Sequence, residues 1–261
     1  MFIVPLAAVL TGCANKNNAT SSDAENTEEK ALLVTPDLSW ADVKGPVKKV
    51  TITSSLGEMK EDSIVEAKAD LAESKISYGF DKEGRLTDYC ESSSYNGEES
   101  SWIHFSVDYA TDSLGTIKNI SEDAVIKGVP INLKRDAANF IATFEFAKDT
   151  DMDFQRIESY TWKDSKIASV ESVGWEWYNN VKYTYDENGN IASADEEGGS
   201  EGESSTTVTT YKYLDFDSHG NWTRRTVTYQ TSIVSEFSDS PTAEKMPANY
   251  QIQTRTIEYF E

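Results

Sequence analysis

The fold of this chain can be read from Tyr183-Thr184-Tyr185-Asp186-Glu187-Asn188-Gly189-Asn190-Ile191. Aromatic and β-branched residues, which favour strands, flank an Asp-x-x-Gly core. The Asp186 carboxylate can accept a hydrogen bond from its own backbone two residues on, and Gly189 can adopt the left-handed conformation that closes the turn. Because a type I turn closed in this way is a common hairpin loop, we expect two antiparallel strands joined at Asp186–Gly189.

Three further segments carry the same core after an aromatic strand end: Tyr78–Leu86, Tyr109–Ile117 and Tyr213–Trp222. A worn copy at Tyr160–Ile167 keeps the aromatic residues and loses the glycine. The expected structural turn residues are Asp81 and Gly84, Asp112 and Gly115, Asp186 and Gly189, and Asp217 and Gly220. Such self-similarity predicts a fold built from repeated hairpins.

The turn cores identify a resemblance to a known family. Phe80-Asp81-Lys82-Glu83-Gly84-Arg85-Leu86 and the stretch quoted above resemble YD repeats of the Rhs type, and Gly45-Pro46-Val47-Lys48-Lys49-Val50 resembles the opening of small YD-repeat lipoproteins. The resemblance covers roughly residues 42 to 230, and only the turn cores are specific. Large Rhs proteins wind such repeats into a shell around a toxin. This chain is short and its repeats are irregularly spaced, so the resemblance implies hairpins and not the shell.

Alternating apolar residues predict further half-buried strands at Ile103–Tyr109 and Phe140–Phe146. Asn96-Gly97 is a strong hairpin signal and Asn179-Asn180 a weaker one. We therefore expect an all-β fold. It is an antiparallel meander of hairpin repeats that forms a large twisted or curled sheet, in one piece or in two sub-sheets, with at most short helices.

Three stretches have less regular patterns. Glu58–Ala72 could form a short helix, because its apolar residues can share one helical face, or a loop and a strand. Asp195–Ser205 and Ser238–Ala248 are polar segments that we expect to be mobile loops.

The N-terminus predicts a membrane anchor. Phe2–Leu10 is an apolar run too short to span a bilayer, and it fits the core of a secretory signal. Leu10-Thr11-Gly12-Cys13 resembles the bacterial lipobox, which implies that Cys13 becomes the lipidated first residue of the mature protein. No Lys or Arg precedes the run, so we expect the natural start to lie further upstream.

The expected organisation therefore has three parts: residues 1–12 form a signal peptide, 13–35 a lipidated cysteine with a disordered tether, and 36–261 the YD-like hairpin domain. The tether assignment follows from a polar composition without aromatics, which cannot offset the entropy of ordering. The resemblance implies a lipid-anchored protein of the cell envelope, in the outer membrane, facing either the periplasm or the surface.

The formal net charge is −21, from 45 acidic and 24 basic residues. Such a field repels phosphate backbones and anionic headgroups, so we expect no nucleic acid partner and contact with the membrane through the lipid alone. A cationic protein, as in the binding of a toxin by its immunity protein, is compatible with this charge.

The motifs for chemistry are weak. Gly198-Gly199-Ser200-Glu201-Gly202 matches the letters of a nucleophile elbow but lacks the strand and helix that the motif requires. His104 and His219 are too few for a typical zinc site, and Cys90 is expected to be a small buried apolar residue. Asp149–Asp153 fails the EF-hand pattern, although a loop site for calcium stays open. We expect no catalytic residues, no metal and no cofactor.

Trp175-Glu176-Trp177-Tyr178 is the main candidate for binding. In a strand, Trp175 and Trp177 would share one face and could stack on a sugar ring, or they could fill the core of the sheet. The sequence thus favours a non-catalytic lipid-anchored scaffold or binding module. The alternatives are a glycan-binding or glycan-active lipoprotein and an immunity-type partner of a cationic protein.

Overall fold

The computed structural model describes residues 32–67, 73–95, 98–109, 116–119, 131–147, 155–235, 237 and 242–261. Residues Leu32–Glu261 form one compact unit, which contains every described residue. The expected lipidation site Cys13, the turn residues Asp112 and Gly115, and Asp149–Asp153 lie outside the described residues. Within the described part of the chain, no helix has the length and apolar content that crossing a membrane requires.

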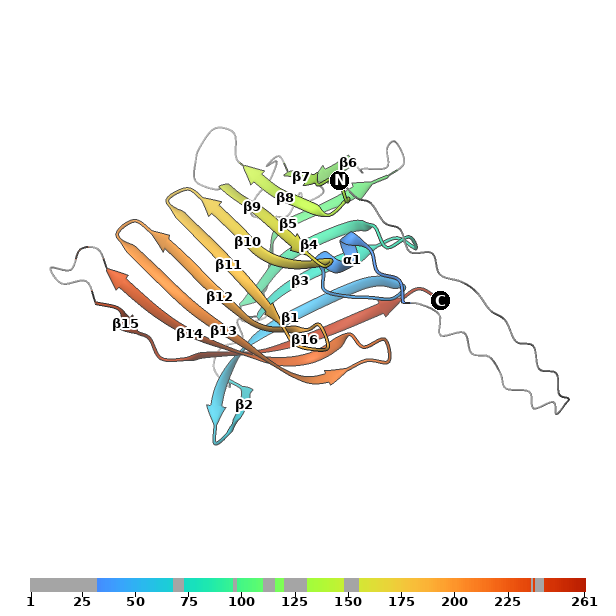
Figure 1. The fold of residues 1–261 in the computed structure, drawn as a ribbon. Helices are drawn as coiled ribbons and strands as arrows, with labels where there is room; N and C mark the ends of the chain where they lie inside the picture. Colours follow the sequence, from blue (N-terminus) through green and yellow to red (C-terminus); the bar gives the residue numbers. More distant parts are fainter. Residues whose placement is uncertain are drawn as a thin grey trace, which may run out of the picture. The chain divides into compact units, whose positions relative to one another are not determined.

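Within the described ranges, the unit consists of one short helix and a single antiparallel sheet (Figure 1). The elements are α1 Pro36–Trp40, β1 Val47–Lys60, β2 Ser63–Glu66, β3 Glu73–Phe80, β4 Leu86–Tyr95, β5 Glu98–Asp108, β6 Thr116–Asn119, β7 Ile131–Arg135, β8 Ile141–Ala147, β9 Gln155–Lys163, β10 Lys166–Gly174, β11 Trp177–Tyr185, β12 Ile191–Ser200, β13 Glu203–Phe216, β14 Trp222–Ser235, β15 Glu244–Lys245 and β16 Asn249–Tyr259. The prediction of an all-β antiparallel fold with at most short helices is confirmed, and the sheet is in one piece.

The strands pair in the order β6-β5-β4-β3-β1-β16-β14-β13-β12-β11-β10-β9-β8-β7, with β2 and β15 attached to β1 and β14. Two meanders, β3–β6 and β7–β14, are therefore joined through the first and last strands of the unit. Val50 of β1 lies opposite Ile257 of β16, and Arg225 of β14 lies opposite Gln253 of β16. The C-terminal strand thus fills the middle of the sheet.

The Asp-x-x-Gly cores form the turns between strands. Asp186 Oδ1 accepts hydrogen bonds from the backbone N–H groups of Asn188 and Asn190, at 2.9 and 2.8 Å. The Gly189 N–H donates to the Asp186 carbonyl, and Gly189 has a φ of 82°, in the left-handed region that favours glycine. The turns at Asp81–Gly84 and Asp217–Gly220 make the corresponding bonds.

Two turns achieve the same connection with other residues. Asp136 accepts hydrogen bonds from the N–H groups of Ala138 and Phe140, and Asn139 takes the glycine position at a φ of 69°. The worn copy becomes a two-residue turn in which both Asp164 and Ser165 have positive φ. Asparagine and aspartate tolerate this conformation better than other residues with a Cβ, which explains how these turns close without glycine.

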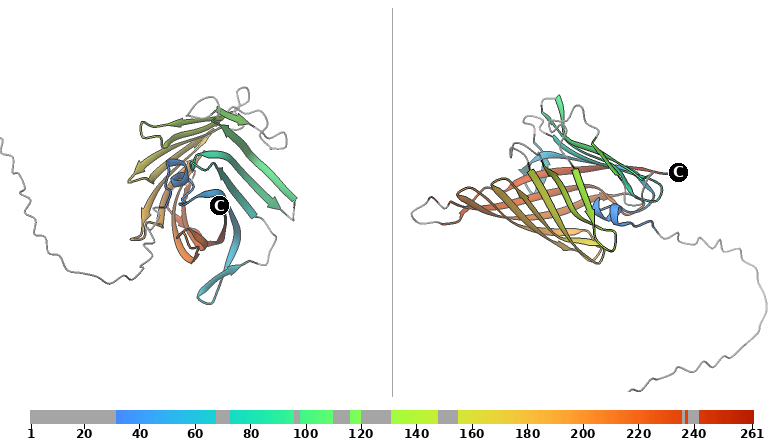
Figure 2. Two further views of the ribbon diagram at one scale, coloured as in Figure 1. Left: turned by 90° about the vertical axis from the view of Figure 1, so that its right-hand side faces the viewer. Right: turned by 90° about the horizontal axis from the view of Figure 1, so that it is seen from above.

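The hydrophobic core lies where the two ends of the sheet face each other around α1 (Figure 2). The Trp40 ring packs against Tyr89 of β4 at 5.3 Å between centroids, against Phe144 of β8 at 6.1 Å, and against Tyr160 of β9 at 6.1 Å. Phe105 of β5 and Phe144 are also in contact, at 5.6 Å, although their strands are far apart in the strand order. The sheet must therefore bend to enclose these aromatic rings.

Helix α1 is held in place by a cap and a buried ion pair. Thr35 accepts a hydrogen bond from the Leu38 N–H and Pro36 begins the helix, as expected for a helix start. Asp37 pairs with Arg135 of β7 through both carboxylate oxygens and also accepts the Leu86 N–H at 2.7 Å. This one carboxylate connects α1 to both meanders.

The structure decides one open alternative and corrects two local expectations. Of the helix and the strand considered for Glu58–Ala72, Glu58–Glu66 adopts strand, because Met59 and Lys60 pair with Ile64 and Ser63 in a β-hairpin. Asp195–Ser205 is not a mobile loop: it forms the ends of β12 and β13 around a two-residue turn. Asn179 and Asn180 lie inside β11 and not at a turn. In each case pairing with neighbouring strands outweighs the polar composition.

Candidate functional site

The candidate site lies on one face of the sheet, on the strands from β11 to β16 and on the neighbouring β1. Directly paired residues share a face, so the register defines rows of side chains that cross the strands. Three rows on the face that bends around the core, here called the inner face, are Tyr211-Val227-Gln251-Leu56, Tyr183-Ala194-Thr209-Tyr229-Asn249 and Val181-Glu196-Thr207-Thr231. The inner face therefore combines aromatic rings with polar groups.

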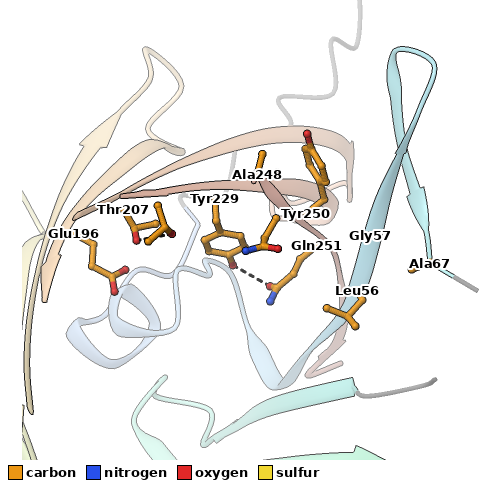
Figure 3. A pocket seen from close by; sticks show the side chains of 11 residues that line it. Leu56, Gly57, Ala67, Glu196, Thr207, Tyr229, Ala248, Tyr250 and Gln251 are labelled. Atoms are coloured by element: carbon orange, nitrogen blue, oxygen red, sulfur yellow. Dashed lines mark hydrogen bonds between the residues drawn. The ribbon is translucent and has the colours of Figure 1, made fainter. Parts of the chain in front are cut away.

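A cavity of about 550 Å³ lies on this surface, here called the inner cavity (Figure 3). Its volume is within the range of small-molecule sites. Figure 3 shows that Glu196, Tyr229 and Gln251 project to the same side of the sheet. The lining residues are Leu56, Gly57, Ala67, Glu196, Thr207, Tyr229, Thr231, Ala248, Asn249, Tyr250 and Gln251.

Small side chains explain why space remains beside Glu196. Its inner-face neighbours along and across the strands include Val181, Ala194, Gly198, Thr207 and Thr209. At the α1 end of the same face, large aromatic rings fill the space instead. A sheet that bends around a packed core at one end thus leaves a hollow where its inner side chains are small.

Tyr229 forms one wall of the inner cavity. Its hydroxyl donates a hydrogen bond to Gln251 Oε1 at 2.9 Å. Burial raises the pKa of Tyr229 to about 12; the nearby Tyr211 and the charge of Glu196 add to this rise, and Arg225 opposes it. The phenol is therefore neutral at physiological pH and can serve as a ring surface and a hydrogen-bonding group.

Tyr183 and Tyr211 extend this wall toward the core. Burial raises the pKa of both phenols, with Glu196 contributing in each case. Arg225 stacks 4.6 Å from the Tyr211 ring centre and 4.1 Å from that of Trp222, and it donates to Gln253 Oε1 at 2.7 Å. These contacts fix the arginine on the inner face, outside the lining of the cavity.

An ion-pair network crosses between the two meanders on the inner face. Arg156 of β9 donates to both carboxylate oxygens of Glu91 of β4, at 2.9 and 3.1 Å, and to Glu158 at 2.6 Å. The hydroxyls of Tyr89 and Tyr160 donate to these two glutamates. Arg156, the two glutamates and the two tyrosines form one network, which holds the two meanders together.

The expected turn residues have structural roles within their own turns. The carboxylates of Asp81, Asp186 and Asp217 bind the N–H groups of their own turns. Burial opposes ionisation of Asp186, but hydrogen bonds from Asn190, Asn188 and Gly189 together outweigh it and lower the pKa of this carboxyl. Residues of three turns, including Asp164 and Asn221, do line a second hollow of about 400 Å³ beside α1. The Asp186 and Asp217 side chains are not part of that lining.

Trp175 and Trp177 do not lie in the middle of a strand as the sequence suggested. Trp175 and Glu176 form the turn between β10 and β11, with Glu176 at a φ of 62°. The two tryptophans are 50% and 37% exposed, so they do not fill the core. Trp177 packs over Gly174, where a Cβ would lie 1.9 Å from its indole nitrogen. The pair therefore forms an aromatic hairpin tip.

The remaining candidates are dispersed. His104 contacts Asp88 at 3.0 Å on the outer face, and His219 stacks on Tyr259 at 4.1 Å. Cys90 is half-buried, so the expectation that it is buried is wrong: it lies on the outer face, opposite Ser77 and His104. Over the described ranges, no three His, Cys, Asp or Glu side chains gather in a way that could hold a metal ion.

Sequence reasoning missed the inner cavity. The alternation of Ala194, Glu196 and Gly198 was available as a signal, because it places a charged residue between two small ones on one face. The polar composition of Asp195–Ser205 favours a loop, and a loop has no alternating faces. The tyrosines at Tyr211 and Tyr229 were recognised only as strand residues.

The fold and the inner cavity define a class of protein: an all-β protein with one open antiparallel sheet and a polar, aromatic hollow on its inner face. No protein-family model matches the sequence, and no curated protein matches it. The chain is similar to the crystal structure of a porin-like protein from Bacteroides uniformis, with a TM-score of 0.45 and 10% sequence identity, over 82% of this chain and 98% of that chain. A TM-score below 0.5 does not establish a common fold.

Proposed function

We propose that this protein is a non-catalytic, lipid-anchored envelope protein that binds a small ligand in the inner cavity. The observation that carries the proposal is the cavity itself, which has the volume of a ligand site and whose polar lining consists of one glutamate, two threonines, two tyrosines and two side-chain amides. A few polar groups in a partly apolar hollow are the usual composition of a binding site.

The anchor rests on the lipobox resemblance of Leu10-Thr11-Gly12-Cys13. Metabolic labelling with a palmitate analogue tests it. The full chain should take up label in a bacterial host and fractionate with membranes, and Cys13→Ser should abolish both. Labelling that survives Cys13→Ser would contradict the anchor, and recovery in outer-membrane fractions would support the expected location.

The non-catalytic assignment is supported by how the carboxylates are used. Asp186 and Asp217 are each engaged by their own turn, and Glu91 and Glu158 are engaged by Arg156. These groups stabilise the backbone and the bend of the sheet, which is a structural use of acidic residues.

A ligand-observed NMR screen of polar fragments against the purified full chain tests binding in the cavity. Thr207→Phe places a ring inside the hollow and should abolish the binding of hits. Val208→Phe is the matched control, because Val208 is the next residue on the same strand and is exposed on the opposite face. Circular dichroism confirms that both variants fold. A screen in which both variants retain every hit, or in which no fragment binds, would contradict the proposal.

A second candidate is favoured by the exposed hairpin tip at Trp175 and Trp177. Exposed aromatic rings can stack on sugar rings, so this tip could bind glycans independently of the cavity. A glycan array probed with the full chain should then give a signal that Trp177→Ala removes and Val173→Ala, on the same hairpin, retains. No glycan signal would eliminate this candidate.

A further inference from the structure

We propose that the inner cavity takes a small molecule with a protonated amine next to hydroxyl groups, such as an amino sugar, and that Glu196 binds its ammonium group. This inference rests on the proposed function and specifies the ligand class of the same site. It follows from the charge, the free hydrogen-bonding capacity and the ring that the cavity presents.

Glu196 is the charged group of the cavity. It lines the hollow, and across the described part of the chain its carboxylate has no ion pair or hydrogen bond. Elsewhere on the inner face, Glu91 and Glu158 both pair with Arg156, so these carboxylates are already neutralised. A carboxylate that faces a hollow without a partner favours a ligand that brings a positive charge.

The nearest cation of the same strands does not neutralise Glu196. Arg225 points toward the core, where it stacks on Trp222 at 4.1 Å and donates to Gln253 and to Tyr213. No lysine or arginine occurs among the residues that line the hollow. An anionic ligand would therefore meet an unpaired negative charge in a protein whose formal net charge is −21.

The remaining lining groups suit an amine that carries hydroxyls. The Tyr229 ring offers a face for a cation, since a cation over a tyrosine ring is attracted by its quadrupole. Tyr229 uses Gln251 Oε1 and leaves the amide nitrogen of Gln251 free to donate to a hydroxyl oxygen. Thr207 and Thr231 bond to each other at 2.9 Å, and each hydroxyl keeps a further lone pair for a ligand hydroxyl.

Three sugars of one ring size, with different charges, test the inference. We would measure the affinity of glucosamine, N-acetylglucosamine and glucuronate for the full chain by titration calorimetry at pH 6, where the glucosamine amine is protonated. Glucosamine should bind, N-acetylglucosamine should bind at least about tenfold more weakly, and glucuronate should not bind. A tenfold loss is the minimum expected when a charge-assisted hydrogen bond is removed.

Glu196→Gln removes the charge and keeps the shape, so it should weaken glucosamine binding by at least about tenfold. Glu197→Gln is the matched control, because it makes the same change one residue along β12, on the exposed outer face. It should change the affinity less than about twofold, as expected for an exposed charge remote from the site.

Equal affinity for glucosamine and N-acetylglucosamine, or a Glu196→Gln variant that binds like the parent, would overturn the amine inference. So would the absence of binding by all three sugars. None of these results decides the proposed function, which the Thr207→Phe fragment screen tests separately. If Thr207→Phe abolishes the fragment hits while the sugar titrations contradict the amine inference, the cavity is a binding site for another class of ligand.

Discussion

Replacing Asp37 with alanine should destabilise the folded unit by about 4 kcal/mol. The side chains of Asp37 and Arg135 are only 4% and 7% exposed, and the pair is held by two hydrogen bonds. Removing one partner of a buried ion pair costs about 3–5 kcal/mol, because the other charge stays buried. The Leu86 N–H would also lose its acceptor, which adds about 1 kcal/mol. Arg135 keeps its bond to the Asn139 carbonyl, so the lower part of the ion-pair range applies.

Urea unfolding followed by tryptophan fluorescence and circular dichroism measures this effect. The set consists of the parent, Asp37→Ala, Arg135→Ala and the double variant. Because the two side chains act as a unit, the double variant should be less destabilised than the sum of the single variants by at least about 2 kcal/mol. Lys134→Ala is the control: it neighbours Arg135 in sequence, its side chain is 69% exposed, and it should change stability by less than about 0.5 kcal/mol.

Two results would refute this reasoning. One is an Asp37→Ala variant as stable as Lys134→Ala, which would mean that the pair does not hold α1 to β7. The other is additivity of the single variants within about 0.5 kcal/mol, which would mean that the two side chains do not interact.

Three further predictions concern the core, the tyrosines and a turn. Trp40→Ala should cost about 3–5 kcal/mol in urea unfolding, because Trp40 fills the space between the two ends of the sheet, whereas the exposed Trp175→Ala should cost less than about 1 kcal/mol. In an absorbance titration, Tyr229 should ionise with a pKa of about 12, above the value of about 10 for an unfolded chain. The contribution of Tyr229 to stability is therefore complete below pH 10 and is lost as the pH rises toward 12, and Tyr229→Phe should reduce that loss of stability. Burial opposes ionisation of Asp217, but hydrogen bonds from Tyr259 and the turn N–H groups outweigh burial and lower the pKa of this carboxyl. The contribution of Asp217 to stability is therefore present above pH 4 and is lost as the pH falls through the folded pKa, and Asp217→Asn should make stability less dependent on pH in this acid range.

The turns were predictable because their chemistry is local. Asp186 and Gly189 are three residues apart, and the bonds that they make lie within that span. The turn at Asp136–Asn139 has the same local chemistry, but asparagine stands where the Asp-x-x-Gly core has glycine, so this core does not predict it. The antiparallel arrangement of the strands was predictable from these turns, because a hairpin turn joins two antiparallel strands.

The bend of the sheet and its inner cavity depend on contacts that sequence spacing does not reveal. Asp37 and Arg135 are distant in sequence, and nothing in either segment indicates the other. Glu196 is one of 45 acidic residues, and its position becomes distinctive only when Thr207 and Tyr229 are placed on the neighbouring strands. The prediction of a loop at Asp195–Ser205 was wrong for the same reason. Pairing with neighbouring strands stabilises this segment as strand despite its polar composition.

The tryptophans show a related limit. A common face for Trp175 and Trp177 requires both residues to lie in one strand. The two-residue turn at Trp175 and Glu176 breaks that strand, and Glu176 takes a positive φ without the glycine or asparagine that would announce it. An aromatic tip was therefore not foreseen.

Binding in the inner cavity requires that the inner face between β12 and β14 be open to small molecules. Thiol labelling at position 207 measures this access: Thr207→Cys, in a full chain that also carries Cys13→Ser and Cys90→Ser, is treated with N-ethylmaleimide without denaturant, beside Val208→Cys on the exposed outer face. We predict that position 207 reacts in the folded protein, at a rate within about tenfold of position 208, as expected for a thiol that solvent reaches. A cysteine at position 207 that stays unreacted until urea unfolds the chain would show that the inner face is filled, and would contradict the account.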